Sequence, residues 1–197
     1  MKNIYLVVAP SGAGKTSLVN ELEQTYGYKS IQSYTTRKPR YEGEKGHIFV
    51  NDKEFDKLEE IIAYTEFCGF KYCATESQIE ESDLYIIDPK GINYFKEHYK
   101  GSKKIKIIYV QAVVSILFER LVKRGKRTGL SHRAAVSGAL KRIENDIIEF
   151  YDYNHNEKVK SEIFLKVENN NRSKKNMKEL AKIVHTQIMK TEDKSNE

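Results

Sequence analysis

A short stretch near the amino terminus has the residue types and the spacing that bind the phosphates of a nucleotide. It reads Ala9-Pro10-Ser11-Gly12-Ala13-Gly14-Lys15-Thr16 and is followed by Ser17. A glycine-rich turn of this kind aims successive backbone N–H groups at phosphate oxygens, with the positive end of the following helix behind them. Lys15 can bridge the outer phosphates, and the Thr16 hydroxyl can hold Mg²⁺. We expect a phosphate-binding loop whose contacts come from Ser11, Gly12, Ala13, Gly14, Lys15, Thr16 and Ser17.

One position of this loop departs from the strict pattern, which begins with Gly where this chain has Ala9. Alanine is the smallest residue with a side chain, so the loop tolerates it unless its φ must be positive. The alternative is an ordinary glycine-containing turn between a strand and a helix. The joint placement of Gly12, Gly14, Lys15 and Thr16 after an apolar run favours the phosphate-binding loop.

A second motif lies about twenty residues further on and reads Ser33-Tyr34-Thr35-Thr36-Arg37-Lys38-Pro39-Arg40. Two arginines three residues apart, with hydroxyl groups before them and a proline that stiffens the turn, suit a dianionic phosphate. Taken alone, the segment is better explained as a solvated basic turn. Together with the first loop, it predicts a second phosphate site opposite the first.

Apolar runs that alternate with amphipathic stretches supply the elements that must position these motifs. Buried parallel strands are predicted at 4–8, 84–87 and 105–110, with weaker strands at 31–35 and 163–167. Helical patterns cover 17–26, 92–99, 114–124, 133–151 and 174–189. Repeated strand–helix units predict an α/β fold, with a parallel sheet flanked by helices.

Two regions interrupt that alternation. Residues 36–75 predict a small, mostly β insertion, with strands at 47–50, 61–68 and 70–74 and a short helix near 52–58. Residues 125–133 form a polar, basic connection between two helices, and a connection of that kind beside a phosphate site is typical of a mobile lid. We expect the polar end of the chain, residues 191–197, to be disordered.

Composition excludes several classes of protein. The chain has 197 residues, a net charge of +6 and two cysteines, Cys68 and Cys73. Two cysteines make no disulfide framework, and no apolar run is long enough for a membrane segment. We therefore expect a soluble, cytoplasmic protein with no membrane partner. Scattered lysines and arginines without a binding motif disfavour nucleic acid as a partner, and the oligomeric state stays open.

On its motifs the chain resembles the guanylate kinase family, over roughly residues 3–170. The matching positions, in family order, are Pro10-Ser11-Gly12-x-Gly14-Lys15-Thr16, Ser33-x-x-Thr36-Arg37-x-Pro39-Arg40, Gly43-Glu44, Phe49-Val50, Gly69-x-x-Tyr72, Asp88-x-x-Gly91, Arg120-Leu121-x-x-Arg124-Gly125 and Arg142-Ile143. The resemblance implies one kinase domain over 1–190. Its core would be 1–35, 76–124 and 152–190, with a monophosphate-binding insertion at 36–75 and a helical lid at 125–151.

The resemblance implies phosphoryl transfer from ATP, with Mg²⁺, to a nucleoside monophosphate, most commonly GMP or dGMP. By carry-over, the catalytic residues would be Lys15, Arg37, Arg124 and Arg142, with Arg127 as a substitute for Arg124 if the lid register differs. The acceptor would be bound by Ser33, Arg37, Arg40, His47, Glu66, Tyr72 and Asp88. His47 stands where the family usually has a tyrosine. Asn169 or Asn170 would approach the adenine of ATP.

The positions that read guanine in the family do not carry over. They fall on Ala63, Ala74 and Ile86, none of which offers a polar side chain. Glu66 is the preferred replacement, and Thr75 is another. The alternatives are a kinase for a different nucleoside or deoxynucleoside monophosphate, a kinase for a ribose bisphosphate, or a catalytically silent interaction module. A nucleotide-dependent regulator or nucleic-acid-linked ATPase is a further alternative, for which Asp88 alone is weak support. Silent relatives typically lack the loop lysine, which is present here as Lys15.

Overall fold

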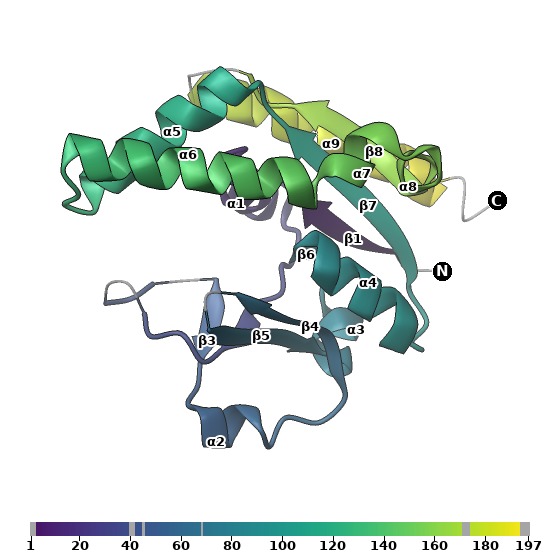
Figure 1. Ribbon diagram of the computed structural model, residues 1–197. Helices are drawn as coiled ribbons and strands as arrows, with labels where there is room; N and C mark the ends of the chain where they lie inside the picture. Colours follow the sequence, from purple (N-terminus) through teal and green to yellow (C-terminus); the bar gives the residue numbers. More distant parts are fainter. Residues whose placement is uncertain (1–2, 40–41, 45, 68, 171–173, 194–197) are drawn as a thin grey trace. The chain divides into compact units, whose positions relative to one another are not determined.

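The computed structural model describes residues 3–39, 42–44, 46–67, 69–170 and 174–193, and Figure 1 labels its helices and strands. The chain divides into two compact units. Unit 1 comprises Met1–Leu6 and Gly27–Ile105, and unit 2 comprises Val7–Tyr26 and Lys106–Glu197. Strands β1 (Asn3–Val8) and β7 (Lys104–Gln111) contribute residues to both units.

Among the described residues, one sheet has four strands in the order β6-β1-β7-β8, with β6 spanning Leu84–Ile86 and β8 spanning Ile163–Glu168. All six residues of β1 are buried, as expected for an interior strand of a parallel sheet. Strands β7 and β8 pair in parallel, with one register shift between Ile107 and Ile108. The α/β class predicted from the alternating pattern is confirmed.

Unit 2 is built mainly of helices. They are α1 (Lys15–Tyr26), α5 (Val114–Arg127), α6 (His132–Glu149), α7 (Tyr151–His155), α8 (Glu157–Glu162) and α9 (Lys174–Asp193). Helices α5 and α6 share a small core of Leu121, Val122, Ala135, Ala139 and Ile143. The glycine at position 125 permits this packing, because a Cβ there would lie 3.0 Å from the Cβ of Ala135. One face of α6 is therefore fixed against α5.

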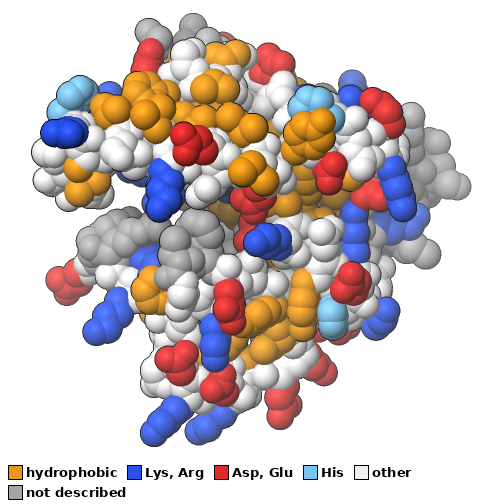
Figure 2. All heavy atoms as spheres, viewed as in Figure 1, with side chains coloured by type: hydrophobic (Ala, Val, Ile, Leu, Met, Phe, Trp, Pro, Cys, Tyr) orange, Lys and Arg blue, Asp and Glu red, His pale blue; other side chains and the backbone are white. Residues whose placement is uncertain are grey.

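The opposite face of α6 is open to solvent. Leu140, Ile147 and Ile148 are exposed, as is Tyr151 at the start of α7. Figure 2 shows hydrophobic side chains at the surface along this part of unit 2. None of the helices in the described ranges has the length and apolar content that crossing a membrane requires.

Unit 1 holds a second sheet. The elements of the unit are β2 (Ser33–Thr35), β3 (His47–Phe49), α2 (Asp52–Phe55), β4 (Ile61–Phe67), β5 (Phe70–Thr75), α3 (Glu76–Glu81), β6 and α4 (Pro89–His98). The described strands pair in the order β3-β2-β5-β4, with β2 parallel to β3 and antiparallel to β5. The register of β4 against β5 shifts between Ile62 and Thr65, where Ala63 adopts a φ of 65°. The mostly β character predicted for this region is confirmed.

Several boundaries differ from the sequence-based expectations. Helix α9 reaches Asp193, although disorder was expected from residue 191, and residues 194–197 lie outside the described ranges. Helix α5 continues to Arg127, because its last turn closes with Thr128 donating to the carbonyls of Arg124 and Gly125, so the connection to α6 is shorter than predicted. Strand β2 begins at Ser33 rather than Ile31. The short helices α3, α7 and α8 were not expected, because runs of five or six residues carry too little periodicity to reveal themselves.

Candidate active site

The glycine-rich loop joins β1 to α1 in unit 2, which is the strand–turn–helix order that a phosphate-binding loop requires. Gly12 and Gly14 have φ values of 82° and 99°, a region that residues with a Cβ rarely adopt. Ala9 is buried and does not have a positive φ, so the missing glycine leaves the backbone unstrained at that position. Helix α1 begins at Lys15, and the first N–H groups of a helix have no partner within it.

Two side chains from distant parts of unit 2 hold the loop in shape. The Asn169 amide, which is buried after β8, donates to the carbonyl of Ala13 at 2.8 Å. Arg120 of α5 donates to the carbonyl of Gly12 at 3.1 Å and to the backbone and side-chain oxygens of Asn169 at 3.0 and 3.3 Å. Burial lowers the pKa of Arg120. The loop carbonyls are thereby turned toward these donors.

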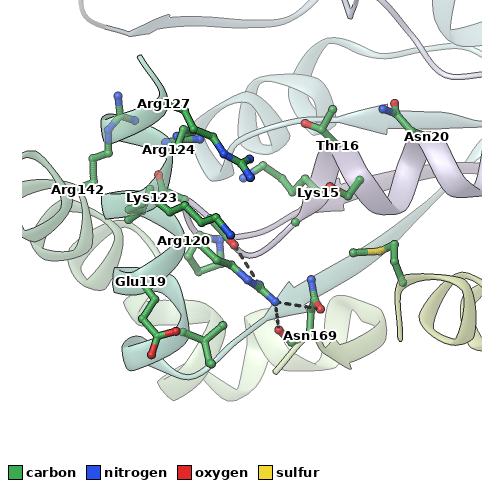
Figure 3. A pocket seen from close by; sticks show the side chains of 18 of the residues that line it. Lys15, Thr16, Asn20, Glu119, Arg120, Lys123, Arg124, Arg127, Arg142 and Asn169 are labelled. Atoms are coloured by element: carbon green, nitrogen blue, oxygen red, sulfur yellow. Dashed lines mark hydrogen bonds between the residues drawn. The ribbon is translucent and has the colours of Figure 1, made fainter. Parts of the chain in front are cut away.

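The loop opens onto a cavity of about 940 Å³, a size that admits a nucleotide. Of the described residues that line it, seven are Lys or Arg and two are Glu. Figure 3 shows the cationic side chains of α5 and α6 on one side and Lys15 and Thr16 of α1 on the other. A cavity of this charge concentrates anions such as a triphosphate.

Apart from Ala13, the donor-side residues named from the sequence are gathered at this cavity. The cavity is lined by Ser11, Gly12, Gly14, Lys15, Thr16, Ser17, Arg124, Arg127 and Arg142. Ala13 is buried, and its N–H donates to the carbonyl of Pro10 at 3.2 Å. The Lys15 ammonium donates to the carbonyl of Ala9. Thr16 and the three arginines are exposed, so their polar ends can meet a bound ligand. Asn169 also lines the cavity, but its amide is engaged with the loop and with Arg120.

Four of the acceptor-side residues come together in unit 1. The register pairs Ser33 with His47 and Thr35 with Tyr72, which brings neighbouring strands into contact. Ser33 Oγ lies 2.9 Å from His47 Nδ1, and the ring centroids of His47 and Tyr72 are 5.7 Å apart. Arg37 lies two residues after the end of β2. Its pKa is raised, mainly by its hydrogen bond with Glu44 and further by Tyr72.

Arg37 is held firmly by its surroundings. Its guanidinium makes two hydrogen bonds to the Glu44 carboxylate, at 2.8 and 3.1 Å, and both side chains are nearly buried, with 10% and 6% of their surface exposed. It also donates to the carbonyl of Lys38 and lies over the ring of Phe49. The Arg37 Nε is buried and has no hydrogen-bond partner among the described residues. Buried polar groups are normally paired, so this N–H is a candidate donor to a ligand.

The other acceptor-side predictions have different outcomes. Arg40 lies outside the described residues. Glu66 is exposed on β4 and accepts a hydrogen bond from the Tyr64 hydroxyl. Asp88 is the N-cap of α4, where its carboxylate accepts from the N–H of Gly91 at 2.6 Å. Asp88 therefore has a structural task, which the sequence reasoning did not assign to it.

The three positions to which the resemblance assigns guanine reading carry apolar side chains. Ala63 and Ala74 are buried in β4 and β5, and Ile86 is half-buried at the end of β6. Ala63 lies in the β4 bulge, so its backbone conformation differs from that of a regular strand. None of these three positions therefore offers a polar side chain to a base.

Comparisons with known proteins find relatives that match most of the chain. It is 33% identical over 169 residues to the guanylate kinase of Koribacter versatilis, covering 76% of this chain and 69% of that protein. The chain belongs to the guanylate kinase family. It is likewise 30% identical over 164 residues to the guanylate kinase of Helicobacter pylori, with 77% of each chain covered. As a member of this family, the chain is a nucleoside-monophosphate kinase.

Comparison of structures agrees on the fold of this guanylate kinase family member. The crystal structure of guanylate kinase from Anaplasma phagocytophilum matches with a TM-score of 0.53 and 20% identity, covering 97% of this chain and 86% of that one. No family model matches the chain.

Three residues of this family member hold the site together without having been assigned that task from the sequence. They are Arg120, Asn169 and Asp146, the last of which contacts Ser11 of the loop. A signal existed for Asp146, because it follows Ala135, Ala139 and Ile143 at helical spacing and so puts a charge on the buried face of α6. Each of these side chains contacts loop residues that lie far away in the sequence, and no local pattern predicts such a contact.

Proposed function

We propose that this protein transfers the terminal phosphoryl group of ATP to GMP or dGMP. The observation that carries the proposal is the complete loop at Ser11–Ser17, with Lys15 and Thr16 in place, opening onto a strongly cationic cavity. Phosphoryl transfer needs little covalent chemistry from a protein, because it depends on positioning and on neutralising charge. Side chains of unit 2 are available for both tasks.

On the donor side, the N–H groups at the start of α1 would bind the phosphates, and Lys15 would contact the outer ones. Arg124, Arg127 and Arg142 line the same cavity and would neutralise the charge that develops on the transferring group. Oxygen ligands suit Mg²⁺, and the exposed Thr16 hydroxyl is the protein oxygen that would hold it beside the phosphates. When bound, the metal would neutralise phosphate charge.

On the acceptor side, the phosphate of the monophosphate would be held by Arg37, with Ser33, His47 and Tyr72 beside it. Two observations support this part of the proposal. The Nε of Arg37 has no hydrogen-bond partner among the described residues, and Glu44 fixes the orientation of the Arg37 guanidinium. A guanidinium held in this way loses little freedom on binding, which favours tight recognition of a dianion.

A nucleoside monophosphate with a base other than guanine is the alternative acceptor. The favouring observation is that Ala63 and Ala74 are buried and apolar where the family presents polar groups to guanine. Each missing hydrogen bond lowers discrimination by about 1 kcal/mol. Glu66 on β4 is exposed, so its carboxylate is accessible for contact with a base from the same unit.

A panel of ribo- and deoxyribonucleoside monophosphates tests the proposal. With Mg²⁺ and ATP, a coupled assay is expected to record ADP only when a suitable monophosphate is present, and kcat/KM is expected to be highest for GMP or dGMP. Preference for another base would support the alternative acceptor. Absence of turnover with every member, together with absence of ATP binding by calorimetry, would contradict the kinase assignment of the site.

Two variants complete this experiment. Lys15→Ala is expected to abolish turnover while circular dichroism stays unchanged, because the side chain lies at the surface of the cavity and not in the core. Lys57→Ala, an exposed lysine of unit 1 outside the cavity, is the matched control and is expected to keep full activity. Full activity in Lys15→Ala would refute the role proposed for that residue.

A further inference from the structure

Asp146 of α6 contacts the phosphate-binding loop through both of its carboxylate oxygens. The backbone N–H of Ser11 donates to Oδ2 at 2.8 Å, and the Ser11 hydroxyl donates to Oδ1 at 3.3 Å. Both residues belong to unit 2, and 135 positions separate them in the sequence. One loop residue is thus held twice by one side chain of the helix.

The carboxylate lies in a mixed environment. It is on the face of α6 that carries Ala135, Ala139 and Ile143 into the core shared with α5, and burial raises its pKa. The Ser11 hydrogen bonds and the charges of Lys15 and Arg142 act in the opposite direction. A half-buried carboxylate is costly unless it is paired, so these partners explain how it is accommodated on an otherwise apolar face.

Arg142 stands four residues before Asp146 on the same helix. Residues at this spacing lie on one side of a helix, about 6 Å apart along its axis. Arg142 lines the cavity into which Lys15 and Thr16 also project. Whatever fixes Asp146 on the loop therefore also fixes the distance between Arg142 and the loop.

We propose that Asp146 is a positioning residue, which anchors α6 on Ser11 so that Arg142 is held at the phosphate site. The inference rests on the proposed function, because it assigns Arg142 to the transferring phosphoryl group. The neutral amide introduced by Asp146→Asn would preserve the anchor, since its oxygen can accept from the Ser11 N–H and its NH₂ can donate to the Ser11 hydroxyl. Alanine would remove both bonds.

The anchor is tested first without any substrate, by amide hydrogen exchange on the full-length protein. The Ser11 amide is expected to exchange about tenfold faster or more in Asp146→Ala than in the wild type, and at the wild-type rate in Asp146→Asn. Glu144→Ala is the matched control, because it removes an exposed carboxylate from the same helix. Equal exchange of Ser11 in all four proteins overturns the anchor.

Steady-state kinetics with ATP and the best acceptor then test the consequence for Arg142. Asp146→Ala is expected to lower kcat by about 10- to 100-fold, the effect of misplacing a group near the reacting atoms, with a much smaller change in KM for ATP. Asp146→Asn is expected to restore most of kcat. An Asn variant as slow as the Ala variant overturns positioning, because charge rather than geometry would then be what matters.

Failure of the anchor and failure of the proposed function give different results. A wild-type protein without turnover counts against the proposed function, and hydrogen exchange at Ser11 alone then decides whether the anchor exists. An active wild type whose kcat is unchanged in Asp146→Ala overturns the inference and leaves the proposed function standing. Thermal unfolding of each variant separates loss of the fold from loss of position.

Discussion

Replacement of Asn169 by alanine is expected to loosen the phosphate-binding loop more than any exposed substitution in unit 2. Its buried amide donates to the carbonyl of Ala13 at 2.8 Å and accepts from Arg120 at 3.3 Å. Alanine fills neither role. The carbonyl of Ala13 would lose this donor, whereas Arg120 would keep its bonds to the carbonyls of Gly12 and of residue 169.

The loss of folding free energy in Asn169→Ala follows from these contacts. Leaving a buried polar group unpaired costs about 1–3 kcal/mol, and the surviving bonds of Arg120 limit the loss, so we expect about 2 kcal/mol. For a chain of this length, each kcal/mol lowers Tm by about 2–4 °C, which gives a decrease of about 4–8 °C. The KM for ATP is expected to rise, because the loop would no longer hold one conformation.

Thermal unfolding followed by circular dichroism and a titration with ATP are the assays. Asn145→Ala, which removes an exposed amide from α6, is the matched control and is expected to leave Tm unchanged within about 1 °C. An Asn169→Ala protein with the Tm and ATP affinity of that control would refute the reasoning.

A double-mutant cycle with Gly14 sharpens this test. A Cβ at position 14 would lie 2.5 Å from Asn169 Nδ2, and φ there is 99°. Gly14→Ala therefore combines a clash with backbone strain, and Asn169→Ala relieves only the clash. The destabilisation caused by Gly14→Ala is expected to be smaller in the Asn169→Ala background than in the wild type. Strict additivity would contradict the contact.

Two further predictions concern unit 1. Glu44→Gln weakens the two hydrogen bonds that hold the Arg37 guanidinium, so KM for the acceptor is expected to rise about tenfold, with KM for ATP nearly unchanged. Glu42→Gln, which changes an exposed carboxylate, is the control. Equal changes in the two KM values would contradict this role of Glu44. Burial raises the pKa of the Cys73 thiol to about 12, so its alkylation, followed by mass spectrometry, is expected to stay slow between about pH 7 and 9 in the folded protein. Because the folded pKa lies above the unfolded value, the contribution of Cys73 to stability is complete below the unfolded pKa. It is lost as pH rises toward the folded value, and rapid alkylation at pH 8 would contradict the burial.

Local sequence determined a large part of this protein. The order of strand, glycine-rich turn and helix around Gly12, Gly14 and Lys15 is written in adjacent residues, because turn chemistry and hydrophobic periodicity act over a few positions. The same is true of the α/β class, the mostly β insertion and the long helices. The family was identified from motifs whose order along the chain is itself a sequence property.

Only the tertiary structure decided how the loop is supported. Asp146 meets Ser11 across 135 positions, and Asn169 meets Ala13 across 156. Asp88 has the residue type of a ligand-binding carboxylate, but the structure shows it capping α4. Glu66, chosen for its chemistry, forms a hydrogen bond with Tyr64 at an exposed position. Which residue a side chain contacts depends on which elements pack together, and the sequence near that residue does not specify this packing. The phosphate-binding loop is thus local in origin, whereas the contacts that hold its shape come from distant segments of the chain.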